Sequence, residues 1–137
     1  LKEIESRFKK SEAEVYRQGD NVVVRLKSIR FPSSRAELPK SSLATLSKVN
    51  DVIKDLEPEK VIVEGHTDSI GGQRANLALS KKRAEAVTSY LIAAKSVDAD
   101  QVTAVGRGFE KPLTTDKTKA GRAENRRVDI IIRPQRL

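Results

Sequence analysis

A short continuous apolar run, Val61-Ile62-Val63, separates two longer segments in which apolar residues recur every three or four positions. A short run that is apolar throughout is typical of a strand buried on both faces, as in parallel sheets. The periodic segments on either side of it are typical of amphipathic helices. This alternation favours an α/β fold, in which helices pack on a sheet that contains parallel strands.

The first helix is expected over residues 43–56. Its apolar positions are Leu43, Leu46, Val49, Ile53 and Leu56. Pro39, Ser41 and Ser42 precede the segment and Pro58 follows it, and these residue types commonly mark where helices begin and end.

The second helix is expected to begin at Ser80 as its N-cap and to end near Lys95. Its buried face is predicted to consist of Ala84, Val87, Leu91 and Ala94. In this interpretation Lys81-Lys82-Arg83 occupy the first turn, where the helix dipole disfavours cations and favours an arriving anion. Thr67-Asp68 ends the apolar strand and adds a carboxylate nearby. The pattern therefore predicts a site for a zwitterion.

The remaining strands are predicted from β-branched runs next to turn residues. Ala13 to Arg17 and Val22 to Leu26 form a hairpin around residues 18–21, and Val102 to Val105 and Val128 to Ile132 form two later strands. The predicted fold class is α/β, a two-layer sandwich. Its order is β-α-β-α-β-β with two main helices on one mixed sheet, preceded by an N-terminal β-hairpin. Residues 1–12 are expected to be a linker or the end of a preceding helix, outside the core, and residues 13–137 to form the domain.

The composition narrows the classes of partner. The 137 residues suffice for one domain, and the net charge of +8 and pI near 9.9 favour a polyanion: nucleic acid, an anionic lipid surface or a carboxylate-rich polymer such as a cell wall. Only three Phe and two Tyr are available for stacking on bases, so the sequence gives less support to binding of single-stranded nucleic acid. The chain begins at Leu1 and has no Met, so we expect it to follow a missing membrane anchor or barrel.

The sequence argues against an enzyme or a metal site. His66 is the only histidine and there is no cysteine. His66-x-Asp68 offers two ligands where a zinc site needs three or four. We therefore predict no catalytic residue, no metal and no cofactor. A hydrolase built around His66 and Asp68 is the weakest alternative.

From Val61 onward the chain resembles the OmpA C-terminal-like domain, the peptidoglycan-binding module of outer-membrane proteins, peptidoglycan-associated lipoproteins and flagellar stator proteins. The resemblance spans about two thirds of the chain. The matching residues are Thr67-Asp68, Gly71, Asn76, Leu79-Ser80, Arg83-Ala84, Val87, Gly106, Gly108, Pro112, Gly121-Arg122 and Asn125-Arg126-Arg127-Val128. Ala75 and Phe109 depart from the family pattern, in which an aromatic and an acidic residue are common. In the family these two positions line the walls of the ligand-binding pocket, so the departures affect the expected affinity and ligand preference.

The resemblance implies a periplasmic domain that binds peptidoglycan non-covalently through the meso-diaminopimelate of its peptide stem. Asp68 matches the residue that takes the ligand's ammonium group, and Arg83 matches the residue that takes its carboxylate. Thr67 and Asn76 match family positions that add hydrogen bonds to the ligand. Ser34 matches a loop position usually filled by a small polar residue, and Arg126 matches a basic residue that borders the pocket.

Each of these residues also has a structural interpretation. Asp68 and Arg83 could form a salt bridge with each other, Asn76 could fix the Gly71-Gly72 loop, and Arg127 could pair with an acidic neighbour. The alternative function is a basic nucleic-acid-binding domain. Its phosphate contacts would be Lys81, Lys82, Arg83, Arg122, Arg126 and Arg127.

Overall fold

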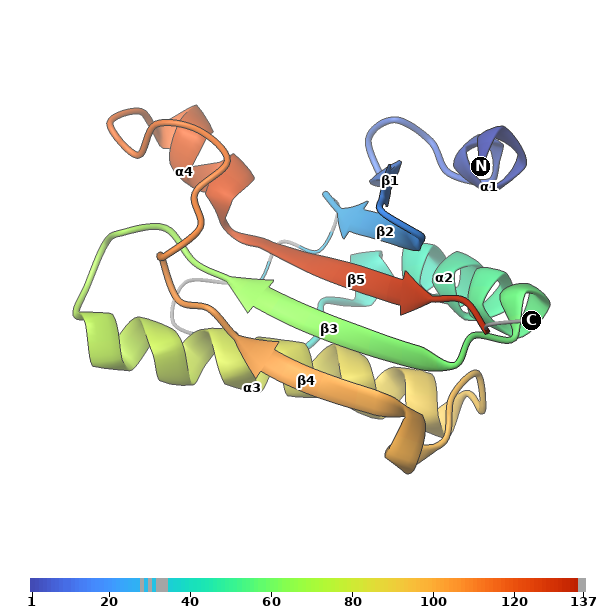
Figure 1. Cartoon of the computed structure of the whole chain (residues 1–137). Helices are drawn as coiled ribbons and strands as arrows, with labels where there is room; N and C mark the ends of the chain where they lie inside the picture. The colour runs from blue at the N-terminus through green and yellow to red at the C-terminus, as the bar shows by residue number, and fades with distance from the viewer. Residues whose placement is uncertain (28, 30, 32–34, 136–137) are drawn as a thin grey trace.

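The fold is built on one five-stranded mixed sheet. The computed structural model describes residues 1–27, 29, 31 and 35–135. The strand order is β1-β2-β5-β3-β4, with β3 and β4 parallel and the other neighbours antiparallel (Figure 1). The bounds are β1 Ala13–Gln18, β2 Asn21–Leu26, β3 Lys60–His66, β4 Val102–Gly106 and β5 Arg127–Arg133. The apolar run Val61-Ile62-Val63 thus lies in β3, between β5 and β4.

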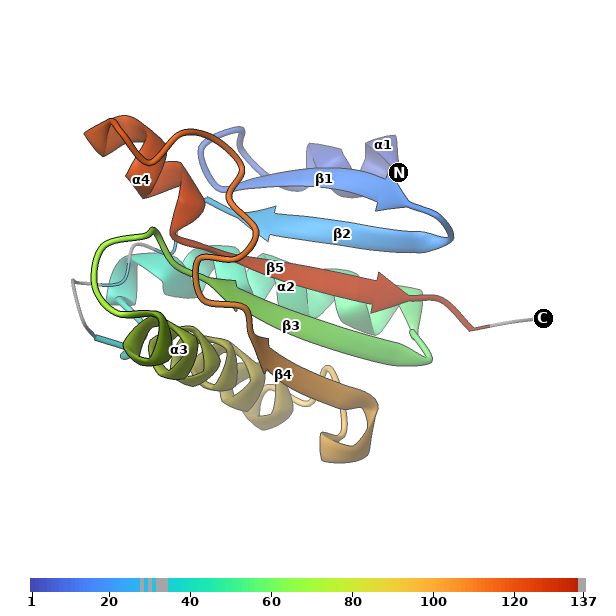
Figure 2. The ribbon, with the colours of Figure 1, turned by 60° about the vertical axis from the view of Figure 1, so that its left-hand side comes forward.

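Two long helices, α2 (Leu43–Leu56) and α3 (Gln73–Ala93), pack on one face of this sheet (Figures 1 and 2). The smaller elements are α1 (Lys2–Ser6), α4 (Lys119–Asn125) and the 3-10 turns η1 (Lys40–Ser42) and η2 (Ala99–Gln101). The predicted sandwich, its N-terminal hairpin and its two main helices are confirmed. The predicted order also placed a strand between the hairpin and the first long helix, and this was wrong: the described residues between β2 and η1 form no strand. The prediction lacked α4. None of the described helices combines the length and apolarity needed to cross a membrane.

The core lies between the sheet and the two long helices. Side chains alternate between the two faces of a strand, so one registered row points at the helices: Val15, Val24, Ile130 and Val63. The helical residues that meet these strands are fully buried: Leu46, Val49, Ile53, Ala84, Val87 and Leu91. The 3.6-residue periodicity therefore identified the central part of each core face correctly. Leu43 and Leu56, at the two ends of α2, are instead 43% and 37% exposed, and Ala94 is only partly buried at the C-cap of α3.

The N-terminal segment belongs to the core, and the expectation that it lies outside was wrong. Ile4 and Phe8 are each only 8% exposed and pack in the same hydrophobic cluster as the sheet. Arg7 Nη1 lies 2.7 Å from Asp55 Oδ2 and so ties this segment to α2. The helical spacing of Ile4 and Phe8 was visible in the sequence. The sequence did not show that the hydrophobic core is left uncovered where these two side chains pack.

We expect Ile4→Ala to lower the free energy of unfolding by about 2 kcal/mol, because it removes buried methylene groups and leaves a cavity. Urea denaturation followed by circular dichroism would measure the change. Lys2→Ala, at an exposed position of the same helix, is the control and should change stability by less than about 0.5 kcal/mol. Equal stabilities for the two variants would show that the segment does not pack on the domain in solution.

Helix α3 begins eight residues earlier than predicted. Its N-cap is Gly72, so Ser80 lies in the helix interior, where it is fully buried. Ser80 Oγ donates to the Leu77 carbonyl and accepts from the Gly108 N–H. Because its hydroxyl is hydrogen-bonded as donor and acceptor, this serine is tolerated in a buried helix interior and does not mark the start of the helix. Because Lys81-Lys82-Arg83 therefore lie more than two turns from the helix start, the dipole argument for an anion site at these residues was wrong.

Candidate functional site

Two loops meet at one end of the sheet. The loop that follows β3 and leads into α3 runs beside the loop that joins β4 to α4 (Figure 2). The Thr67 N–H donates to the Gly108 carbonyl at 2.8 Å, and the Ser69 N–H donates to Asp116 Oδ2 at 2.8 Å. These bonds fix the position of Asp68, which lies between them in the sequence.

Asn125 organises the second of these loops. It is fully buried, and its Oδ1 accepts from the N–H groups of Leu113 and Thr114. Its Nδ2 donates to the Thr114 carbonyl and to Asp116 Oδ1. The hydrogen bond from Ser69 is the main reason that the pKa of Asp116 lies below its usual range. The sequence interpretation gave Asn125 and Asp116 no role, because a side chain that bonds a distant loop leaves no periodic signal.

Asp68 is held by two donors. It is 7% exposed, and its Oδ1 accepts from the Ile70 N–H at 3.0 Å, an Asx turn within the loop. Its Oδ2 accepts from Arg126 Nη1 at 2.5 Å. Arg126 is the C-cap residue of α4, so a side chain from far along the chain completes the surroundings of Asp68.

Arg83 reaches the same region from α3. It is 3% exposed, its Nε donates to the Arg35 carbonyl at 2.9 Å, and its guanidinium carbon lies 4.9 Å from the centre of the Phe31 ring. Burial, followed by the charge of Arg126, lowers the pKa of Arg83 to about 10, while the charge of Asp68 raises it. Arg83 therefore stays charged at neutral pH. Arg126 binds Asp68 directly, and Arg83 lies close enough to both for their charges to influence its pKa.

The three supporting residues predicted for the site differ in what the structure shows for them. Thr67 is 4% exposed, and its Oγ1 has no hydrogen-bond partner among the described residues. Asn76 Nδ2 donates to the Ile70 carbonyl at 2.9 Å, so the interpretation that Asn76 fixes the loop is confirmed. Ser34 lies outside the described residues.

Several alternatives lose support. Two of the six cations required by nucleic-acid binding, Arg83 and Arg127, are 3% and 7% exposed. Arg127 Nε donates to Asp129 Oδ2, which confirms that it pairs with an acidic neighbour. His66 lies beside Glu64 and Asp129, whereas Asp68 is bound to Arg126, so the pair assumed for a hydrolase is not assembled.

Comparison with known proteins identifies relatives that match most of this chain. A sequence model of the OmpA family matches residues 30–126. The chain is 39% identical over 121 residues to "Probable lipoprotein YiaD" of Escherichia coli, covering 88% of this chain and 55% of that protein. It is 36% identical over 104 residues to "Peptidoglycan-binding protein ArfA" of Mycobacterium tuberculosis, covering 76% and 32%.

Solved structures agree with this relationship. The cell wall anchor of the T6SS from Pseudomonas aeruginosa superposes with a TM-score of 0.80 at 31% identity, covering 90% of this chain and 89% of that one. The peptidoglycan-associated lipoprotein from Burkholderia pseudomallei gives 0.69 at 31% identity, covering 77% and 88%. The chain spans 55% and 32% of the two sequence relatives named above. From the family match, the sequence identities and the shared fold, this chain belongs to the OmpA family.

Proposed function

We propose that this domain binds peptidoglycan non-covalently through the meso-diaminopimelate of its peptide stem, and that it anchors a cell-envelope protein to the wall from the periplasm. The names of two relatives, a peptidoglycan-binding protein and a cell wall anchor, support the polymer and the role. The observation that carries the finer proposal is the convergence of Asp68, Arg83 and Arg126 where the two loops meet.

The side chain of meso-diaminopimelate ends in an ammonium and a carboxylate on one carbon atom. Such a group needs a carboxylate and a cation close together, and Asp68 and Arg83 provide that pair. Arg126 occupies Asp68 Oδ2 and thus stands where the ligand's ammonium would bind. We infer that the incoming ammonium shares or displaces Arg126, which is 39% exposed in its side chain and can turn toward the ligand's carboxylate.

Two neighbouring residues fit the same binding mode. Thr67 contributes a buried hydroxyl that lacks a described partner, and a buried hydroxyl gains free energy when a ligand supplies its hydrogen bond. Asn76 acts indirectly by holding the Ile70 carbonyl and with it the loop that carries Asp68. Ser34 stays a predicted contact. No bond is made or broken, so the proposal requires recognition and no catalysis.

Binding to a soluble stem peptide tests the proposal directly. We expect calorimetry to show binding of a diaminopimelate stem peptide, and at least about 30-fold weaker binding, roughly 2 kcal/mol, for Asp68→Asn and for Arg83→Gln. Lys82→Gln and Asp51→Asn are matched controls, because they make the same charge changes at exposed positions. A stem peptide with lysine in place of diaminopimelate lacks the terminal carboxylate and should also bind weakly.

Two outcomes would overturn parts of this proposal. If folded Asp68→Asn and Arg83→Gln sediment with purified sacculi as the native chain does, and all are released by moderate salt, then bulk positive charge accounts for the attraction. Nucleic acid would then be the next ligand to test. If both variants lose wall binding but lysine-type and diaminopimelate-type peptides bind the native chain equally, the site is correct and the ligand specificity is wrong.

A further inference from the structure

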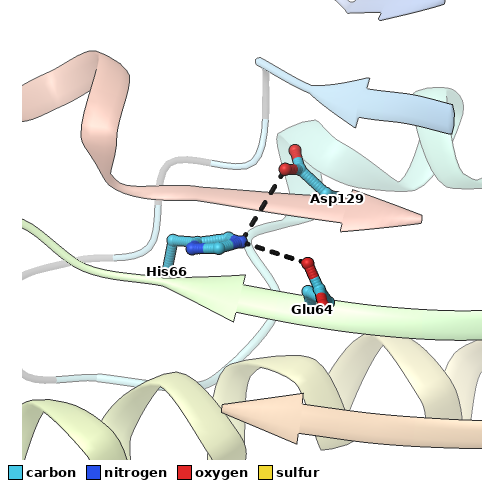
Figure 3. Close-up of side chains that lie close together, drawn as sticks. All are labelled: Glu64, His66 and Asp129. Atoms are coloured by element: carbon cyan, nitrogen blue, oxygen red, sulfur yellow. Dashed lines mark ion pairs between the residues drawn. The ribbon is translucent and has the colours of Figure 1, made fainter. Parts of the chain in front are cut away.

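A second group of polar side chains lies on the face of the sheet opposite α2 and α3. Alternation along the strands places Glu64 and His66 of β3 on this face. The sheet register pairs Glu64 with Asp129 of β5, and Figure 3 shows the three side chains converging. All three are buried, at 8%, 1% and 5% exposure. The proposed peptidoglycan site does not use this group.

His66 is poorly satisfied in these surroundings. Its Nε2 lies 3.7 Å from Glu64 Oε1 and 3.7 Å from Asp129 Oδ2, which is within ion-pair distance of both carboxylates but too far for a hydrogen bond to either (Figure 3). Neither ring nitrogen has a hydrogen-bond partner among the described residues. A buried polar group without a partner is costly, so this geometry points to a species that occupies the space between the three atoms.

The spacing suits a metal ion. Two ligand atoms that each lie about 2.0 to 2.1 Å from one zinc ion stand about 3.3 to 3.6 Å apart at tetrahedral to trigonal angles. The two 3.7 Å separations from His66 are close to that range. The two carboxylate oxygens lie within 4.8 Å of each other, and binding one ion would draw them together by a small rotation of the Glu64 and Asp129 side chains. We propose that Glu64, His66 and Asp129 bind a divalent transition-metal ion, with Zn²⁺ the best fit to one imidazole and two carboxylates.

The surrounding arginines orient the carboxylates. Arg107 donates from Nε and Nη2 to Glu64 Oε2, which leaves Oε1 directed at His66. Arg25 Nε binds Asp129 Oδ1 at 3.0 Å. Asp129 Oδ2 accepts two longer bonds of 3.3 Å, from Arg25 Nη2 and Arg127 Nε. Metal-binding carboxylates are commonly held by such outer hydrogen bonds.

The same arginines limit the affinity. Three guanidinium charges offset the two carboxylates, and Nδ1, which carries the proton when Nε2 binds metal, has no described acceptor. We therefore expect binding in the micromolar range. A cavity of about 120 Å³, whose lining includes Tyr16 and Lys111, adjoins the three residues and has room for water as a fourth ligand. The ion would join β3 to β5 across the sheet.

The single histidine makes the test specific. The tag-free, chelator-treated 137-residue chain would be titrated with ZnCl₂ by calorimetry, and the His66 ring nitrogens followed by NMR. We expect one equivalent to bind with a large shift of the Nε2 signal. We expect His66→Gln and Asp129→Asn to bind at least tenfold more weakly. Glu14→Gln, at an exposed carboxylate of β1, is the control and should bind as the native chain does.

Arg107→Gln separates a metal site from a purely structural ion-pair network. Glutamine can still donate a hydrogen bond to Glu64 Oε2 but removes the positive charge, so Zn²⁺ binding should become several-fold tighter in a metal site. A purely structural ion-pair network predicts no gain in Zn²⁺ binding. The proposal is overturned if the His66 signals of the native chain do not respond to millimolar Zn²⁺. It is also overturned if folded His66→Gln, checked by circular dichroism, binds with native affinity.

Discussion

Replacing Gly65 with alanine should destabilise the domain by about 3 kcal/mol or more, one of the two largest effects that we expect from a single substitution. Gly65 lies in β3 directly under α3, and an added Cβ would stand 2.1 Å from the Ser80 carbonyl oxygen. That oxygen belongs to helix backbone and cannot rotate away. The whole helix must shift, which would separate the core residues that α3 and β3 share.

Gly106 in β4 makes the same kind of approach, since its Cβ would stand 2.6 Å from the Lys81 nitrogen. Gly72→Ala is the matched control. An added Cβ there meets nothing within 4 Å, and Gly72 has a φ of −78°, which alanine adopts freely, so we expect a change below about 1 kcal/mol. Urea denaturation gives all three values. A Gly65→Ala chain as stable as Gly72→Ala would show that α3 does not pack this closely on β3 in solution.

Asn125→Leu should cost about 3 to 4 kcal/mol and should also weaken peptidoglycan binding, although Asn125 itself is fully buried. The substitution keeps the number of side-chain heavy atoms and their branching but removes an acceptor from two backbone N–H groups and a donor to Thr114 and Asp116. The groups that lose Asn125 belong to exposed or partly buried residues, so each costs about 1 kcal/mol, the low end of the range for a polar group left without a partner. Asp116 would then lose one of the bonds that hold it against Ser69, next to Asp68.

Thermal denaturation and stem-peptide binding would be measured on the same preparations. Glu124→Ala, one residue earlier and exposed, should leave both quantities near the native values. If Asn125→Leu lowers stability but binds the stem peptide with native affinity, then the 113–116 loop does not support the site. If stability is unchanged, the hydrogen-bond network does not form in solution.

The charged residues of the candidate site were predicted in part. Asp68 could be located because it follows an apolar strand, and Arg83 because it lies in a cationic run and matches the family pattern. The reason first given for Arg83, a position at the helix N-terminus, was wrong, because Ser80 is an interior residue bonded to Leu77 and Gly108. A serine before a periodic segment is compatible with a cap and with a buried helix position, and local sequence does not distinguish them.

The group formed by Glu64, His66 and Asp129 was missed for a different reason. The sequence suggested His66 with Asp68, two residues away, but residues i and i+2 share a face only while the strand continues. β3 ends at His66, so Asp68 belongs to the loop, whereas Glu64 lies on the same face as His66. Asp129 joins them through the register of β5 against β3, which depends on pairing between strands distant in sequence.

The sequence by itself determined the elements with regular periodicity: the hairpin, the two long helices, the buried strand β3 and the central core positions of the helices. Local repeats suffice for these because burial on one face must follow the period of the element. Only the tertiary structure decided where α3 begins, that Ile4 and Phe8 complete the core, and which side chains meet across loops and strands. These features depend on backbone approach at Gly65 and Gly106 and on sheet register, which are contacts between residues far apart in the chain.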